Sequence, residues 1–129
     1  MKTREVAYRV WDKKEKKMIY DAESYPLDRY DPQETAFIDF YTFEGSYTLM
    51  QYIGLRDAKK KKIFEGDIVK VISTQTQEVC RGEVSYYEGN AMYVIEIDNG
   101  SFLTFASCDV SRVEVLGNIF ENSGILGWL

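Results

Sequence analysis

Residues 63–71 read Ile-Phe-Glu-Gly-Asp-Ile-Val-Lys-Val, and this stretch decides the fold. Its Gly-Asp pair precedes an alternating run rich in β-branched residues, which is typical of a strand that leaves a tight turn. Gly66 relieves the backbone at that turn because it has no Cβ, and Asp67 is expected to cap nearby amides. We interpret Glu65, Gly66 and Asp67 as the entry to a strand and not as a reactive group. The run therefore predicts the start of a small antiparallel barrel.

A ladder of short strand-like segments continues from this stretch. The patterns over residues 67–73, 78–87, 91–98, 101–106 and 112–116 predict five strands, and residues 107–111 predict a single helical turn before the last one. Five short strands with a tight hairpin and a one-turn connector before the fifth describe an SH3-like antiparallel barrel. We place this barrel at residues 62–120.

The strongest local prediction concerns the turn at Asn99-Gly100. Both residues tolerate positive φ, which favours a two-residue type I′ turn between the third and fourth strands. This turn sets the register and therefore divides the two strands into two faces. The expected core face holds Tyr93, Ile95, Ile97, Phe102 and Thr104, and the other face holds Glu96, Asp98 and Ser101.

The N-terminal part is also predicted to be rich in β structure. Residues 5–11 alternate like a strand, residues 13–17 form a lysine-rich turn, residues 18–20 complete a hairpin, and residues 47–54 form a further strand. Between them, Asp31, Pro32 and Glu34 have the spacing of a helix start, which predicts one helical turn followed by a strand. The expected class is mainly β: an N-terminal β-hairpin region over residues 1–56 with at most short helical turns, packed on the barrel, and an apolar C-terminal tail over residues 121–129.

Composition points to an ordinary globular protein. The chain has 129 residues, of which 45% are hydrophobic and 29% charged. A globule of this length buries roughly two thirds of its unfolded surface, so it needs neither disulfides nor a structural metal to fold. Cys80 and Cys108 are far apart in sequence, and the first residues lead into a strand pattern instead of a signal peptide, which indicates a reducing cytoplasm. No apolar run approaches the length of about twenty residues that a membrane span needs, so no membrane partner is expected.

The charge of the chain disfavours a general nucleic-acid binder. The net charge is −5, whereas such proteins carry a broad basic surface. Lysines nevertheless gather at residues 13–17 and at Lys59, Lys60, Lys61 and Lys62. Short runs of this kind usually form exposed turns between strands, and the second run is the candidate for a local nucleic-acid patch.

Four motifs, in order along nearly the whole chain, resemble the YopX family of phage and prophage proteins. They are Arg9 to Lys13, Leu49 to Asp57, Ile63 to Val69 and Gly117 to Asn122. In that family the turn between Asp57 and Ile63 usually carries an Asn-Gly pair, and here Lys59-Lys60 take those places. The resemblance implies a mobile-element origin and hence the cytoplasm of a host cell. It implies no activity and no catalytic residues, because the family is one of unknown function.

The chemical inventory argues against an enzyme. The chain has no histidine, which excludes Ser-His-Asp and Cys-His nucleophiles and His-containing metal sites. We interpret Cys80 and Cys108 as half-buried small residues on strands, because no cationic neighbour is evident that would activate a thiolate. The pairs Glu65 with Asp67 and Glu96 with Asp98 have a spacing that is common on any solvated sheet face. No nucleotide-binding motif appears, and we expect no cofactor.

Binding is the larger class of function. Aromatic residues make up 15% of the chain, and Tyr86, Tyr87 and Tyr93 gather around one predicted turn, where they form a candidate partner-binding cluster. The alternative is that alternate tyrosines point into the barrel while their hydroxyls reach water. Trp128 and Leu129 end an apolar tail, which is expected to dock either on its own domain or on another chain.

Three hypotheses follow from these features. The first is a non-enzymatic adaptor whose β-rich body binds a host or phage protein, with a homo-oligomer as one of its possible forms and the apolar tail docked either on its own domain or on another chain. The second is a nucleic-acid-binding accessory protein that uses the lysines at 59–62 with the tyrosines. The third is a small carboxylate-dependent enzyme built on Glu65, Asp67, Glu96 or Asp98. We favour the first because the usual catalytic groups are missing and aromatic residues are abundant.

Overall fold

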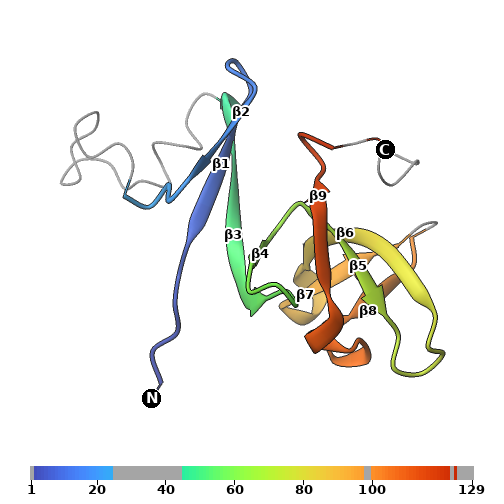
Figure 1. Ribbon diagram of the computed structural model, residues 1–129. Helices are drawn as coiled ribbons and strands as arrows, with labels where there is room; N and C mark the ends of the chain where they lie inside the picture. The colour runs from blue at the N-terminus through green and yellow to red at the C-terminus, as the bar shows by residue number, and fades with distance from the viewer. Residues whose placement is uncertain (1, 25–44, 98–99, 123, 125–129) are drawn as a thin grey trace. The chain divides into compact units, whose positions relative to one another are not determined.

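The computed structural model of the chain describes residues 2–24, 45–97, 100–122 and 124. The fold is mainly β, as predicted, and the described residues form two antiparallel sheets joined by loops and short 3-10 turns (Figure 1). The chain divides into two compact units, Met1–Tyr52 and Ile53–Leu129. The predicted helix start at residues 31–34, the turn residue Asn99 and the tail residues 125–129 lie outside the described residues.

The first unit is built around a hairpin. Strand β1 (Tyr8–Asp12) pairs antiparallel with β2 (Lys17–Tyr20) on one side and with β3 (Tyr47–Arg56) on the other. This confirms the predicted hairpin across the lysine-rich turn. Val10 lies opposite both Ile19 and Leu49, and it forms a small buried cluster with Ala22. Strand β3 continues into the second unit, where β4 (Lys62–Phe64) joins the same sheet, whose order is β2-β1-β3-β4.

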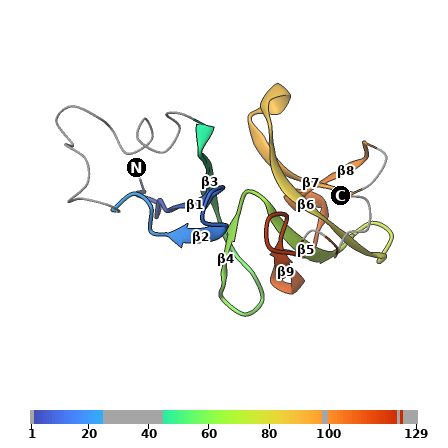
Figure 2. The ribbon, with the colours of Figure 1, turned by 90° about the horizontal axis from the view of Figure 1, so that it is seen from above.

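The second unit contains the five predicted strands as one curled antiparallel sheet (Figures 1 and 2). They are β5 (Asp67–Ile72), β6 (Val79–Tyr87), β7 (Met92–Glu96), β8 (Phe102–Thr104) and β9 (Glu114–Asn118). Their order is β8-β7-β6-β5-β9, so the last strand returns beside the first. The turns η3 (Phe105–Ser107) and η4 (Val110–Arg112) precede β9, where one helical turn was expected, and η2 (Glu88–Asn90) joins β6 to β7. The closure of this sheet into an SH3-like barrel stays a prediction.

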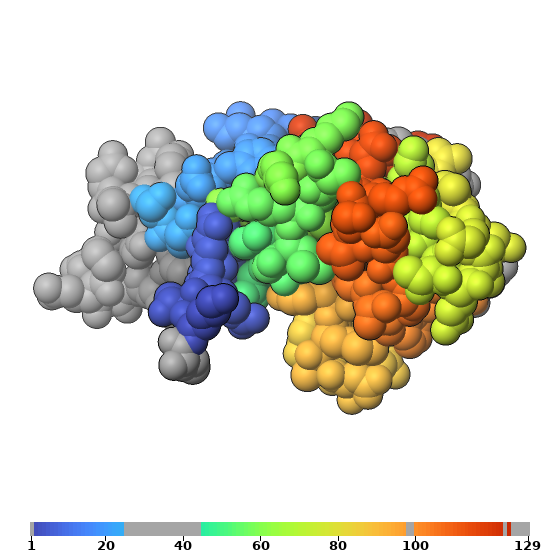
Figure 3. Space-filling model, turned by 60° about the horizontal axis from the view of Figure 1, so that its bottom comes forward, coloured from blue at the N-terminus to red at the C-terminus, as the bar shows by residue number. Residues whose placement is uncertain are grey.

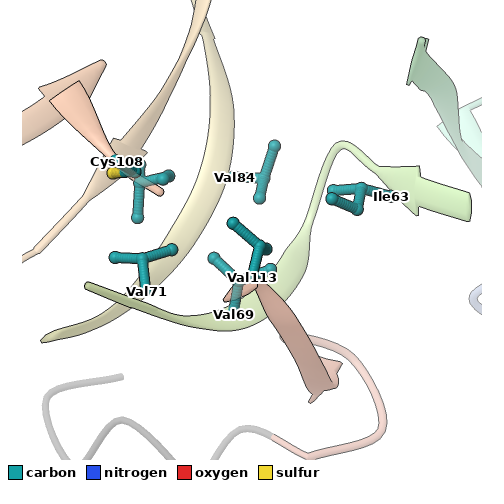
Figure 4. Packing of buried hydrophobic residues seen from close by; sticks show 7 residues of the cluster. Ile63, Val69, Val71, Val84, Cys108 and Val113 are labelled. Atoms are coloured by element: carbon teal, nitrogen blue, oxygen red, sulfur yellow. The ribbon is translucent and has the colours of Figure 1, made fainter. Parts of the chain in front are cut away.

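The core of the second unit lies inside the curl of the sheet (Figure 4). Alternate residues of β5 and β6 point inward, because successive side chains of a strand face opposite ways. Each fully buried aliphatic side chain contributes about 1.5 to 3 kcal/mol relative to exposure. The buried members are Ile63, Val69, Val71, Val84, Ile95, Cys108 and Val113. Cys80 is half-buried against this cluster, and both cysteines are free thiols, in keeping with their interpretation as small packing residues.

The predicted register of β7 and β8 is wrong by one residue. The observed pairs are Ile95 with Leu103 and Glu96 with Phe102, and the Ile97 N–H donates to the Ser101 carbonyl at 2.9 Å. Three residues, 98–100, therefore separate the paired residues instead of two. Gly100 has a φ of +78°, which suits the left-handed position of a three-residue hairpin loop. Because a one-residue shift exchanges the faces of a strand, Leu103 and not Phe102 points to the core.

Candidate functional site

The four sequence motifs share one structural feature: each contains an Asp or Asn whose side chain caps backbone amides of a turn. In the first motif, Asp12 is buried at the end of β1. Its Oδ1 accepts hydrogen bonds from the N–H groups of Lys14 (3.0 Å) and Glu15 (3.1 Å). The side chain therefore closes the β1–β2 turn, and its acceptor oxygen is occupied by the backbone.

Asp57 of the second motif accepts three hydrogen bonds from backbone N–H groups. Its Oδ1 accepts from the N–H groups of Lys59 and Lys61, each at 2.9 Å, and its Oδ2 accepts from the N–H of Val115 in β9 at 3.0 Å. Burial acts to raise the pKa of this carboxyl, but the amides of Val115, Lys61 and Lys59 and the charge of Lys61 outweigh it and lower the pKa. Asp57 thus ties the turn that contains Lys59 and Lys61 to Val115 in β9, which lies 58 residues later in the chain.

Asp67 of the third motif has the role expected for it. Its Oδ2 accepts a hydrogen bond from the Phe64 N–H at 2.8 Å, and the residue is only 1% exposed. Gly66 has a φ of +85°, a conformation that a residue with a Cβ adopts only with strain. The Asp67 carboxylate is thus buried and engaged in closing this turn.

The fourth motif folds into a loop after β9 that is held by its own side chains. The Asn118 Oδ1 accepts from the N–H groups of Phe120 (3.0 Å) and Glu121 (2.9 Å), and its Nδ2 donates to the Glu121 Oε1 at 2.8 Å. Asn122 accepts from the Asn118 N–H at 3.2 Å. A Cβ on Gly117 would lie 2.5 Å from the Asn122 Oδ1, so this position has no room for a side chain as the loop stands. These polar groups are engaged in turn capping.

The structure describes one of the two remaining candidate carboxylates. Glu96 is exposed on β7, and Asp98 lies outside the described residues. Within the described part of the chain, no three His, Cys, Asp or Glu side chains gather in a way that would hold a metal ion. In the described part of the chain, no helix is long and apolar enough to cross a membrane.

Part of the predicted lysine patch is either half-buried or paired with a carboxylate. Lys59, Lys60 and Lys61 are exposed, whereas Lys62 is half-buried on β4. The Lys59 Nζ lies 3.7 Å from the Glu114 Oε1, and Lys70 lies 3.5 Å from the other oxygen of the same carboxylate. Lys60 has a φ of +69°, the left-handed conformation that glycine favours, at the second place of the family's Asn-Gly pair.

The three predicted tyrosines lie at the end of the β6–β7 hairpin, but on two different faces. Tyr86 is opposite Tyr93, and their rings meet edge to face with centroids 5.3 Å apart. Tyr87 is opposite Met92 on the other face of the sheet, because neighbouring residues of a strand point to opposite sides. The end of this hairpin, in gold in Figure 3, protrudes from the rest of the second unit.

Tyr87 belongs to an aromatic surface that the sequence did not reveal. Its ring centroid is 5.3 Å from that of Phe102, across β7, and the two residues are 41% and 42% exposed. Between them lies Val94, which faces the same side and is only 2% exposed. We call Tyr87, Met92, Val94 and Phe102 the outer aromatic face. Phe102 was missed because the two-residue turn placed it in the core.

Two carboxylates border the outer aromatic face. Glu83 of β6 lies directly opposite Glu96 of β7, and Glu96 in turn lies opposite Phe102. Burial, and then the charge of Glu96, raise the pKa of Glu83. Glu83 was not singled out in the sequence, although counting back from the η2 turn would have placed it across from Glu96. Trp128 and Leu129, the other predicted binding residues, lie outside the described residues.

Several solved structures share this fold, including the two that follow. Protein EF1440 from Enterococcus faecalis superposes with a TM-score of 0.60 at 22% identity, covering 96% of this chain and 99% of that one. Protein yopX from Bacillus subtilis superposes with a TM-score of 0.58 at 20% identity, covering 93% and 97%. No curated protein matches the sequence. The family model described as YopX protein matches residues 7–127, nearly the whole length, and the chain belongs to the YopX family.

Proposed function

We propose that this chain is a non-enzymatic protein-binding module, of the phage or prophage origin that its family resemblance implies, and that the outer aromatic face is its binding surface. The exposure of Tyr87 and Phe102 as a contacting pair is the observation that supports this most directly. Large aromatic residues in contact with each other and open to solvent are typical of the anchors of protein interfaces.

The use of polar residues in the four motifs supports a role without catalysis. A catalytic group needs a side chain that is free to reach a substrate. Asp12, Asp57, Asp67 and Asn118 instead accept hydrogen bonds from backbone amides. The motifs are thus explained by the folding of their turns.

The nucleic-acid alternative has less support. Lys59 shares the carboxylate of Glu114 with Lys70, which reduces the positive charge of the turn at residues 59–62. Glu83 and Glu96 also lie beside the aromatic residues on which bases would have to stack, and their charge would repel phosphates. The nucleic-acid alternative would be favoured if the chain bound DNA or RNA at low salt and if charge reversal of Lys59 to Lys62 weakened that binding.

A comparison of three baits tests the proposal. They are the wild-type chain, a Tyr87→Ser/Phe102→Ser variant and a Tyr20→Ser control, since Tyr20 is a 50% exposed tyrosine of the first unit. From host lysate, the wild type and the control are expected to retain a common protein that the double variant loses. Retention of the same proteins by all three baits would exclude the outer aromatic face as the binding surface. Light scattering on the purified wild-type chain and double variant tests separately whether the chain forms a homo-oligomer and whether this face contributes to it.

A further inference from the structure

Glu83 and Glu96 form an uncompensated pair of like charges. They lie directly opposite each other on β6 and β7, where like charges destabilise a sheet. Among the described residues, neither carboxylate has an ion-pair partner within 4.0 Å. A fold that keeps such a pair gains nothing from it in the free state, and local conflicts of this kind are expected at functional sites.

Among the described residues, no lysine or arginine forms an ion pair with either of these carboxylates within 4.0 Å. Arg81 is the next residue of β6 on the same face, and it lies opposite Lys70 of β5. Lys70 is engaged with Glu114, away from β7. On the other side of Glu96 the neighbour is Phe102, so the carboxylates adjoin the outer aromatic face without an intervening cation.

We infer that the partner of the outer aromatic face is a protein segment that presents arginine or lysine side chains next to apolar ones. This inference rests on the proposed function and adds the chemistry of the partner to it. An apolar segment alone would desolvate two like charges on docking, whereas a cation would pair with them as it docks. Arginine suits the surface especially well, since its planar guanidinium pairs with carboxylates and stacks on aromatic rings. The negative charge also disfavours an acidic partner.

The experiment uses two short synthetic peptides, one that alternates arginine with leucine and one with glutamate in place of each arginine. Each is titrated at low salt into the full-length isotope-labelled chain, and amide shifts are followed by NMR. The arginine peptide is expected to shift the amides around Glu83, Tyr87, Glu96 and Phe102, and the glutamate peptide is not.

A Glu83→Gln/Glu96→Gln variant is expected to bind the arginine peptide with about fivefold lower affinity, as for the loss of two solvent-accessible ion pairs. Loss of folding cannot explain that result, because removing the repulsion is expected to raise the melting temperature. Glu78→Gln, which removes an exposed carboxylate just before β6, is the matched control and should bind like the wild type.

The outcomes separate the inference from the proposed function. If both peptides bind equally and Phe102→Ser weakens both, the outer aromatic face binds proteins and only the inference on charge is wrong. If neither peptide shifts these amides, the outer aromatic face does not bind extended apolar segments. Both the proposed binding role of this face and the inference on its partner's charge are then wrong. Binding that maps to other residues also contradicts both.

Discussion

At the scale of single residues, short polar side chains decide how the turns of this protein close. A carboxylate or amide oxygen that accepts two or three backbone N–H groups satisfies donors that would otherwise be buried without a partner. Asp57 does so for a turn and for a distant strand together. The cost of losing such a group is therefore larger than that of an ordinary surface substitution.

Asp57→Ala is expected to lower the free energy of unfolding by about 2 to 4 kcal/mol at pH 7, because three amides lose their acceptor. Asp57→Asn should fall between this variant and the wild type, since it keeps one acceptor oxygen. Urea denaturation followed by circular dichroism measures both. As a control, Asp109→Ala removes a cap that bonds only to Ser111 and should cost less than about 1 kcal/mol.

The same substitution makes a prediction about pH. The pKa of Asp57 is lower in the folded protein than its ordinary value of 3.8, so its charged form stabilises the fold above that pH. This stabilisation is lost as the pH falls through the folded-state pKa. The difference in stability between the wild type and Asp57→Ala should therefore be greatest near neutral pH and shrink in acid. A constant difference across that range would contradict this role of the charge.

Lys60→Gly is expected to stabilise the chain by about 0.5 kcal/mol, because a left-handed φ costs a residue with a Cβ more than it costs glycine. The hydrogen bonds at this residue come from its backbone and are retained. Lys61→Gly, at a residue without a positive φ, is the control and should destabilise by a similar amount. Thermal unfolding of the two variants under the same conditions compares them, and equal effects would exclude the conformational explanation.

At the scale of elements, the pairing of β6 with β7 carries most of the proposed binding surface. The two strands approach closely at Gly82, where an added Cβ would lie 2.4 Å from the backbone oxygen of Glu96 and 2.7 Å from the side chain of Ile95. Because the first contact is with backbone, a side chain at this position must move one strand relative to the other.

Gly82→Ala is expected to destabilise the chain by about 1 to 3 kcal/mol and to shift the amide resonances of β6 and β7. Gly124→Ala adds the same methyl group where a Cβ meets nothing within 4 Å, and it should change stability by less than about 0.5 kcal/mol. Chemical denaturation of both variants measures the difference. Unchanged stability of Gly82→Ala would show that the strands can separate without cost.

At the scale of the whole molecule, the two units have different relations to the proposed function. Turn caps occur in both, at Asp12 in the first and at Asp57, Asp67 and Asn118 in the second. The outer aromatic face and the opposed carboxylates belong to the second unit alone. Family membership therefore reflects residues that shape the fold throughout the chain, whereas the proposed binding chemistry is concentrated on one face of one sheet.

Sequence alone determined the mainly β class, the hairpin at residues 8–20, the five strands of the second unit and the role of Gly66 and Asp67. These features depend on side-chain alternation and on turn residues, which act over a few neighbouring positions. Only the tertiary structure decided that Asp57 reaches Val115, that Glu83 opposes Glu96 and that Phe102 meets Tyr87 on the outside. The reason is that one residue more in the hairpin loop exchanges the two faces of a strand, and the sequence pattern at Asn99-Gly100 fits a shorter loop equally well.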